Sequence, residues 1–388
     1  MARNISNPLS SSTVTSVPLG GYADVFTGGS AYKLVGSIVN RTNYPDMSLA
    51  FPRSSAFNSF ASAQINGSSV NWNVATYGAG VFLVTGGANA TNLTGCATSS
   101  DGVTWSNQIL PNALNYRSAA YGAGQFVVIG CNQTATTNLY CTSPDGITWT
   151  SRTFPVTSYF GRVIWSKELA LFIVTTGAPE IGSAGPYILT SPDGINWTSR
   201  AVTSRQYSGI ASGPAGLVIC SGNTTTDGTT VTTSVDGVTF VDRVCPAARW
   251  LSIAYGRGQY VMVGFQQVTS VYLPVIATSP DGITWTIRAA AGVPSTLTTN
   301  ASPMICWGDG SFLAVWPSYT TSSADGIAWV PRPAVVSGLC GQIAYGNGQF
   351  LLAPQVAGYT VVNIVVENSV DSEYMYISGT IGKYVRVK

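Results

Sequence analysis

Apolar and polar residues alternate in short runs along this chain, and from about residue 70 onward two patterns of runs recur. The first is an apolar run, a glycine-containing pair and a second apolar run, as in AAYGAGQFVVIG from residue 119 and IAYGNGQFLLA from residue 343. Short apolar runs joined by residues that tolerate positive φ predict a β-hairpin with a tight turn. Each copy is therefore expected to form the first two strands of a structural unit.

The second pattern is Ser-x-Asp-Gly-x-x-Trp, as in TSPDGITWT from residue 142. Its Asp-Gly pair predicts a second turn, and the residues up to the tryptophan open a further strand. The aspartates of the pattern are Asp101, Asp145, Asp193, Asp236, Asp281 and Asp325, with a degenerate seventh at Asp371. The tryptophans are Trp105, Trp149, Trp197, Trp285 and Trp329, and Phe240 takes the place of the tryptophan after Asp236.

Successive aspartates of this pattern lie 43 to 48 residues apart. A period of roughly 40 to 50 residues is typical of the four-stranded blades of a propeller. The sequence therefore predicts an all-β protein, a seven-bladed β-propeller of four-stranded antiparallel blades. Eight blades are the alternative, because YPDMSLAFPR at 44–53 resembles a worn copy of the second pattern.

Residues 1–60 do not follow the period, so the predicted domains are an N-terminal extension, 1–60, and a propeller, 61–388. The first 30 or so residues are rich in Ser, Thr, Gly and Pro, which predicts an attachment arm that orders only against a partner. A hairpin at 44–53 is expected to pair with the last blade and close the ring, which would remove its open edges.

Composition narrows the function. Charged residues make up only 9% of the chain and the net charge is +2 without a basic block, which argues against nucleic acid as a partner. The N-terminus has no apolar core of signal-peptide length, which predicts synthesis in the cytoplasm. No run reaches the roughly 18 apolar residues of a membrane helix, so membrane insertion is not expected.

Residue types limit the chemistry further. The chain has no histidine, which removes Ser-His-Asp and Cys-His catalysis and the commonest metal ligand. Its seven cysteines contain no CxxC pair, so zinc is not predicted, and they are expected to be small buried hydrophobic residues. Neither a metal nor another cofactor is predicted.

The Ser-x-Asp-Gly-x-x-Trp pattern resembles the Asp-box of sialidase-type (BNR) β-propellers, although it lacks one residue between Asp and Gly. The combined unit, YGxGxF followed by TSPDGxTW, resembles propeller repeats of phage tail and other virion proteins. The resemblance implies that the aspartate accepts backbone N–H groups within its own turn and that the tryptophan wedges between strands or blades. It also implies a phage virion structural protein of the tail or a surface appendage, located in the virion. Such a protein would contact other virion proteins through its N-terminal arm and bind a host surface glycan or receptor.

Two other functions remain open at this stage. An Asp-box glycosidase would need a carboxylate pair, and Glu180 and Asp227, in loops between second and third strands, are the candidates. Most of the sixteen Asp and Glu residues lie in the repeat or near the ends, so binding is favoured over catalysis. A purely structural decoration or spacer protein is the other alternative.

The candidate ligand site lies at the start of each first strand, five residues before the aromatic residue of the turn. Five aromatic side chains occupy this position in succession, Trp72, Tyr116, Phe160, Tyr207 and Trp250. They would either pack between blades or form a sugar-stacking platform, for which Arg117, Arg205 and Asp227 would supply hydrogen bonds. Arg162 and Arg249 lie near the same strand starts, so the four arginines form either an anion-binding cluster or separate blade-bridging contacts.

Overall fold

A computed structural model gives the fold of the chain, which divides into two compact units, residues 59–365 and residues 1–58 with 366–388. The predicted propeller segment, 61–388, therefore extends too far at its C-terminal end. The structure describes residues 22–24, 38–40, 59–65, 71–86, 93–131, 136–177, 185–222, 227–268, 271–291, 293–294, 302–332, 334, 340–354, 360–365, 373–376 and 383–386.

The smaller unit contains one antiparallel sheet of short strands from both ends of the chain. They are β1 (Tyr22–Asp24), β2 (Ile38–Asn40), β30 (Glu373–Tyr376) and β31 (Lys383–Arg386), in the order β1-β31-β30-β2. The strand β30, which follows the degenerate seventh copy of the Asp pattern, thus pairs with β2 and β31. Asp371 itself and the hairpin predicted at 44–53 lie outside the described residues.

The larger unit begins with three four-stranded antiparallel sheets, each built from consecutive strands. The first contains β4 (Trp72–Gly78), β5 (Val81–Gly86), β6 (Gly95–Ser99) and β7 (Ser106–Ile109). The second contains β8 (Asn115–Gly122), β9 (Gln125–Cys131), β10 (Thr137–Ser143) and β11 (Thr150–Ser158). The third contains β12 (Phe160–Ser166), β13 (Leu171–Thr176), β14 (Gly185–Ser191) and β15 (Thr198–Arg205).

A seven-stranded sheet follows, in which the long strand β19 belongs to two repeats of the pattern. Its first half pairs with β18 as far as Ala248, and its second half pairs with β20 from Arg249 onward. The strands are β16 (Tyr207–Gly213), β17 (Gly216–Ser221), β18 (Gly228–Ser234), β19 (Val241–Gly256), β20 (Gln259–Val268), β21 (Val271–Ser279) and β22 (Thr286–Arg288).

Two more four-stranded sheets complete the larger unit, and the last of them recruits a strand from the N-terminal side. The first of the two contains β23 (Met304–Gly308), β24 (Ser311–Trp316), β25 (Tyr319–Ser323) and β26 (Val330–Arg332). The other contains β27 (Cys340–Gly346), β28 (Gln349–Pro354), β29 (Thr360–Val365) and β3 (Ser59–Gln64). The strand β3 pairs antiparallel with β29 from Ser59 to Gln64, so it supplies the outer strand of this sheet.

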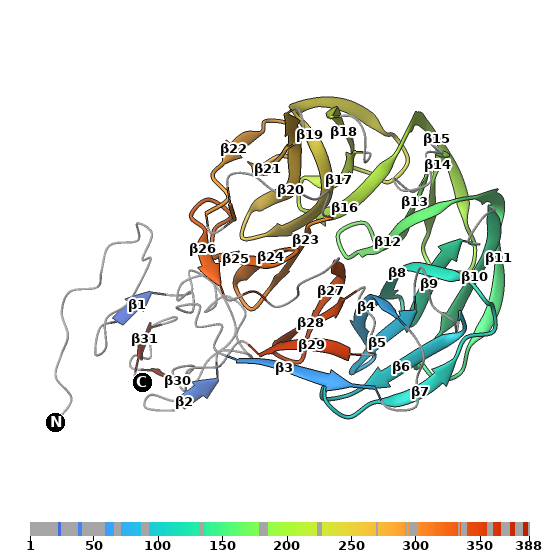
Figure 1. The fold of residues 1–388 in the computed structure, drawn as a ribbon, viewed down its shortest axis with the longest axis horizontal. Coiled ribbons are helices and arrows are strands. Elements are labelled where there is room, and N and C mark those ends of the chain that lie inside the picture. Colours follow the sequence, from blue (N-terminus) through green and yellow to red (C-terminus); the bar gives the residue numbers. More distant parts are fainter. Residues whose placement is uncertain are drawn as a thin grey trace. The chain divides into compact units, whose positions relative to one another are not determined.

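The sheets follow one another around a ring (Figure 1). The first strand of each repeat lies innermost, and these inner strands are β4, β8, β12, β16, the second half of β19, β23 and β27. Each inner strand contacts the next one along the chain, and β27 contacts β4. The series of inner strands is therefore closed, and the sheets radiate outward from it.

Hydrophobic side chains fill the spaces between neighbouring sheets. Phe126 and Val128 of the second sheet, for example, share a buried cluster with Leu83 of the first. Burial of a side chain of this size stabilises the fold by roughly 1.5 to 3 kcal/mol. The prediction that the cysteines are buried hydrophobic residues is confirmed for Cys96, Cys131, Cys141, Cys220 and Cys245.

The inner strands interlock through glycines that end one strand and aromatic rings of the following strand. A Cβ added to any of these glycines would overlap the neighbouring ring. The pairs are Gly78 with Tyr121, Gly122 with Trp165, Gly213 with Tyr255, Gly256 with Trp307, Gly308 with Tyr345, and Gly346 with Tyr77. Between β12 and β16 both positions are serine, and Ser166 Oγ and Ser212 Oγ lie 2.7 Å apart in a hydrogen bond.

Candidate functional site

The aspartates of the Ser-x-Asp-Gly turns make local hydrogen bonds that close the turn. Asp145 Oδ1 accepts the N–H groups of Ile147 and Thr148, each at 2.8 Å, and the hydroxyl of Ser143 at 3.0 Å. Equivalent donors, the serine hydroxyl two residues before the aspartate and the N–H groups two and three residues after it, bind the other five turn aspartates. These are Asp101, Asp193, Asp236, Asp281 and Asp325. These carboxylates therefore have a structural role, as the sequence predicted.

The hydrogen bonds also favour the ionised form of each carboxyl group. The backbone N–H groups of Thr104 and Val103 lower the pKa of Asp101 to about 2. Those of Thr239 and Val238 lower the pKa of Asp236 to about 2. The pKa of Asp193 is lowered too, although partial burial acts in the opposite direction. A group with so low a pKa is a poor general acid at neutral pH.

The tryptophans of the pattern anchor these turns between sheets. The indole N–H of Trp149 donates to the carbonyl of Gly146 at 3.0 Å, and its ring packs on the cluster shared by the first two sheets. Trp105, Trp285 and Trp329 make the same hydrogen bond to the glycine three residues earlier. Trp197 donates instead to the hydroxyl of Tyr140 at 2.9 Å. The predicted wedge between neighbouring blades is confirmed at Trp149.

The aromatic residues at the starts of the inner strands do not form an exposed platform. Their exposed fractions are 1% for Trp72 and 0% for Tyr116, Phe160, Tyr207 and Trp250. The sugar-stacking interpretation of these side chains is therefore wrong, because a stacking surface has to be accessible. The alternative interpretation, packing between sheets, is correct.

The polar atoms of three of these rings form the same kind of hydrogen bond within the protein. Tyr116 Oη, Tyr207 Oη and Trp250 Nε1 each donate to the carbonyl four residues earlier, at 2.5, 2.7 and 2.9 Å. The acceptors are Asn112, Thr203 and Pro246. These contacts fix the chain that leads from one repeat into the next inner strand. These hydrogen bonds were not predicted, because the amino-acid sequence does not distinguish a buried aromatic residue from an exposed one.

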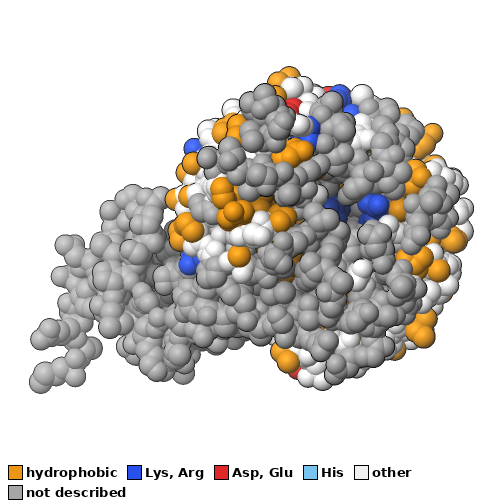
Figure 2. All heavy atoms as spheres, viewed as in Figure 1, with side chains coloured by type: hydrophobic (Ala, Val, Ile, Leu, Met, Phe, Trp, Pro, Cys, Tyr) orange, Lys and Arg blue, Asp and Glu red, His pale blue; other side chains and the backbone are white. Residues whose placement is uncertain are grey.

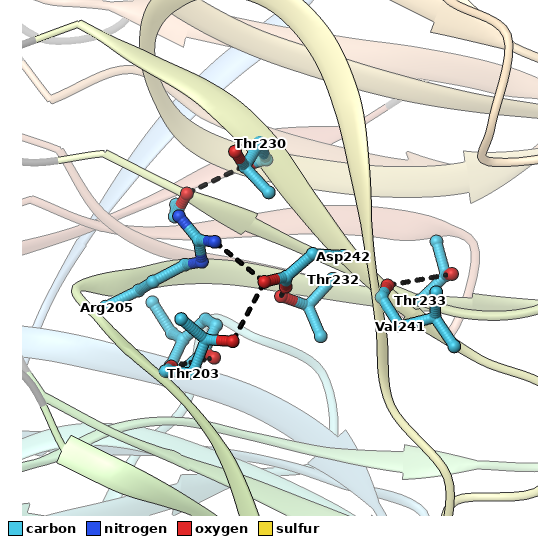
Figure 3. Close-up of polar contacts among 9 residues, drawn as sticks. Thr203, Arg205, Thr230, Thr232, Thr233, Val241 and Asp242 are labelled. Atoms are coloured by element: carbon cyan, nitrogen blue, oxygen red, sulfur yellow. Dashed lines mark hydrogen bonds and ion pairs between the residues drawn. The ribbon is translucent and has the colours of Figure 1, made fainter.

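Arg205 forms a blade-bridging ion pair. Its Nη2 lies 2.7 Å from Oδ2 of Asp242, which also accepts the hydroxyl of Thr203 at 2.9 Å. Asp242 Oδ1 accepts the hydroxyl of Thr232 at 2.8 Å. Figure 3 shows the carboxylate between the arginine and these threonines. The pair thus joins β15 to β19. Burial acts to raise the pKa of Asp242, but the hydrogen bonds that its carboxylate accepts outweigh burial, so the pKa is lowered.

Arg249 lies deeper, with its side chain only 2% exposed. Its Nε is 3.6 Å from Oδ1 of Asp227, and its Nη2 donates to Oε1 of Gln267. The guanidinium carbon is 5.5 Å from the ring centre of Phe265 and 5.8 Å from that of Tyr272, a cation–π arrangement. Asp227, predicted to contact a ligand, is exposed and faces this arginine.

Arg117 and Arg162 complete the set of four arginines. Arg117 is half-buried, and its Nε donates to Cys131 Sγ at 3.1 Å. Arg162 lines a small cavity between the inner strands, and its Nη1 donates to the carbonyl of Arg117 at 3.2 Å. Lys and Arg side chains are visible near the middle of the ring in Figure 2. The four arginines do not make one cluster, because Arg205 and Arg249 face separate carboxylates.

The remaining predictions can be compared with the structure only where it describes the residues concerned. Glu180, the proposed partner of Asp227 in a carboxylate pair, lies outside the described residues, as do most loops between second and third strands. Within the described ranges, no three His, Cys, Asp or Glu side chains are placed to bind a metal ion. No helix in the same ranges has the length and apolar character needed to cross a membrane.

Comparison with known proteins places the fold in a class. No protein-family model matches the sequence, and no curated protein matches it. Hydrazine synthase of Kuenenia stuttgartiensis matches with a TM-score of 0.58 at 9% identity, over 77% of this chain and 98% of that one. The Cps50 (Swd1) β-propeller domain of Myceliophteria thermophila matches with a TM-score of 0.52 at 7% identity, over 78% and 99%. The chain is thus an all-β propeller of four-stranded antiparallel blades. Identities this low show the fold alone.

Proposed function

We propose that this protein is a phage virion structural protein, of the tail or a surface appendage, whose seven-bladed propeller binds a glycan or receptor on the host surface. Seven blades are supported by the division of β19 between two repeats, which splits the seven-stranded sheet into two blades. The assignment to a virion rests on the resemblance of the repeat to propellers of phage tail proteins. The proposed binding role rests on the contacts that the residues of the repeat make within the fold.

The observation that supports a binding role is that the recurring carboxylates and aromatic rings of the repeat are engaged within the fold itself. The turn carboxylates accept hydrogen bonds of their own turns, and the aromatic rings at the strand starts are buried. The connection between the second and third strands varies in length from repeat to repeat. Trp316 and Tyr319 are joined by a two-residue turn, whereas the segment 177–184 separates β13 from β14. Loops of varied length on a rigid scaffold are the usual location of recognition residues.

Binding to cells and release of sugar distinguish the candidate functions. Fluorescently labelled full-length protein should bind host cells saturably, and removal of surface polysaccharide from those cells should reduce the binding. Release of reducing sugar from purified host polysaccharide would instead favour the glycosidase. Failure to bind any strain that the phage infects, with no sugar released, would favour the spacer protein.

The N-terminal arm is proposed to attach the propeller to neighbouring virion proteins. Deletion of residues 1–30 should leave a folded propeller that no longer enters particles, because β3, which completes the last sheet, remains. Incorporation is measured by mass spectrometry of purified particles complemented with the truncated or the full-length protein. Normal incorporation of the truncated chain contradicts the arm as the anchor.

A further inference from the structure

The turn between β27 and β28 differs from the equivalent turns of the ring in its first residue. Asn347 and Gly348 form it, with φ values of +46° and +75°. The same pair of positive φ values occurs in equivalent turns whose first residues are Ala79, Ala123, Arg257 and Asp309. Among these turns, the one at Asn347 therefore carries a side-chain amide. The glycine after it has no Cβ that would keep its backbone nitrogen away from the amide carbon.

Both groups of this turn are accessible. Asn347 is exposed, and its Nδ2 donates a hydrogen bond to the carbonyl of Ser100 at 3.2 Å. Within the described ranges, the N–H of Gly348 donates no hydrogen bond. A Cβ added to Gly348 would meet no atom within 4 Å, so the backbone borders open space here. Hydroxide from solution can therefore reach the Gly348 N–H.

The Asp-Gly turns of the repeat, in which the same two groups are adjacent, hold both of them in hydrogen bonds. Gly146 donates its N–H to Ser143 Oγ at 2.8 Å in a buried contact, and Asp145 Oδ1 accepts three donors. Four other turns contain the same bond from glycine to serine, at Gly102, Gly194, Gly237 and Gly326. A buried, hydrogen-bonded N–H is shielded from hydroxide. Attack by the glycine nitrogen is therefore hindered at Asp145–Gly146 and unhindered at Asn347–Gly348.

We propose that Asn347 is a site of spontaneous modification in the folded protein, by attack of the Gly348 backbone nitrogen on the side-chain amide carbon. Hydroxide takes the proton of the Gly348 N–H, the nitrogen forms a bond to Cγ, and the bond from Cγ to Nδ2 breaks. The leaving nitrogen takes a proton from water and departs as ammonia, which leaves a cyclic imide. Water then opens the imide at either carbonyl, giving aspartate or isoaspartate. The net reaction consumes one water and releases one ammonia, without oxidation or reduction.

The position of Asn347 links this reaction to the closure of the ring. Asn347 Nδ2 donates to the carbonyl of Ser100, and Gln349 Nε2 donates to that of Asp101 at 2.8 Å, so the last sheet contacts the first Asp-Gly turn. An aspartate has no donor and places a negative charge beside the Ser100 carbonyl. An isoaspartate also lengthens the backbone of a two-residue turn whose ends pair at Gly346 and Gln349. Either product should weaken the contact between the last and first repeats.

Peptide mass spectrometry of the full-length protein, incubated folded in mildly alkaline buffer, tests the site. We expect Asn347 to convert to aspartate and isoaspartate, whereas Asp145–Gly146 in the same sample forms no isoaspartate. The rate at Asn347 should rise in proportion to the hydroxide concentration. Gly348→Ala should slow it by about tenfold, because the added methyl group hinders the approach of the nitrogen. Asn347→Gln is the second variant: it keeps Gly348, but its longer side chain closes a larger ring and should remain intact.

Chemical denaturation of the same samples tests the effect on the ring. Asn347→Asp, which reproduces one product, should unfold at a lower denaturant concentration than the fresh unaltered protein, and the incubated unaltered protein should shift in the same direction. Incubated Asn347→Gln should match its own fresh sample. An Asn347 that remains unchanged overturns the proposal, as does isoaspartate forming at Asp145–Gly146 as fast as products form at Asn347. Unchanged stability of the converted protein overturns the link to ring closure.

Discussion

Gly346 at the end of β27 lies directly against the ring of Tyr77 in β4, so the last inner strand packs on the first. The relationship repeats the glycine–aromatic contact found between consecutive inner strands. It is, however, made between residues at opposite ends of the propeller sequence. Together with the pairing of β3 and β29, it closes the ring at two radii, one near the axis and one at the outer edge.

Gly346→Ala should destabilise the protein by about 1 to 3 kcal/mol, because the new methyl group would overlap the Tyr77 ring. The free energy of unfolding is measured by chemical denaturation. Gly348→Ala is the control: its φ of +75° makes alanine strained, but no atom lies within 4 Å of the added carbon. It should cost about 1 to 2 kcal/mol, the penalty for the left-handed conformation alone. If Tyr77→Ala does not reduce the loss caused by Gly346→Ala, steric overlap is not its origin.

Asp145→Ala should lower the free energy of unfolding by about 1 to 2 kcal/mol, because three donors in an exposed turn lose their acceptor. Asp145→Asn retains an Oδ1 acceptor and should lose less than half as much. Both variants should bind host cells like the unaltered protein. Loss of cell binding without loss of stability would move Asp145 from a structural to a recognition role.

Stability should decrease as the pH is lowered from about 4 toward 2. The pKa values of the six turn aspartates are lowered in the folded protein, to about 2 for Asp101 and Asp236. The unfolded chain, with aspartate pKa values near 3.9, therefore binds protons more tightly, and acid favours it. The contribution is fully present above pH ~4 and is lost as the pH falls through the folded values. Denaturation midpoints that stay constant from pH 5 to pH 2 would contradict this.

Ala123→Asn should stabilise the protein by about 0.5 to 1 kcal/mol. Ala123 has a φ of +45° in the turn between β8 and β9, a conformation that asparagine tolerates better than alanine. Asn347 occupies the equivalent turn position between β27 and β28 with a φ of +46°. Asn347→Ala should accordingly destabilise, and by more, since it also removes the hydrogen bond from Nδ2 to the carbonyl of Ser100. Thermal denaturation of both variants provides the comparison.

Removal of residues 1–65 should destabilise the propeller far more than removal of residues 1–30. The longer deletion removes β3, exposing the edge of β29 and the cluster around Ile65, which is 1% exposed. Proteolysis in native buffer measures the difference, with cleavage expected first in the last sheet. Equal resistance of the two truncated proteins would show that β3 is dispensable for closure.

The sequence alone determined the features that depend on near neighbours in the chain. The period, the paired strands and the turns at Asp-Gly follow from local pattern. The bonds of Asp145 could be predicted because its backbone donors lie two and three residues away. The burial of most of the cysteines followed from their place in apolar strands.

Tertiary structure decided what depends on distant segments. The outer strand of the last sheet is β3 and not a strand after Asp371, because β30 pairs with β2 instead. Trp250 is buried because it packs in one cluster with side chains of the preceding repeat, such as Cys220 and Val231, which residue type cannot reveal. Arginines at similar places in the repeat meet different partners: Arg205 pairs with a carboxylate on β19, whereas Arg162 turns into the central cavity. Local sequence fixes each strand and turn, but only the closed ring brings such side chains to their partners.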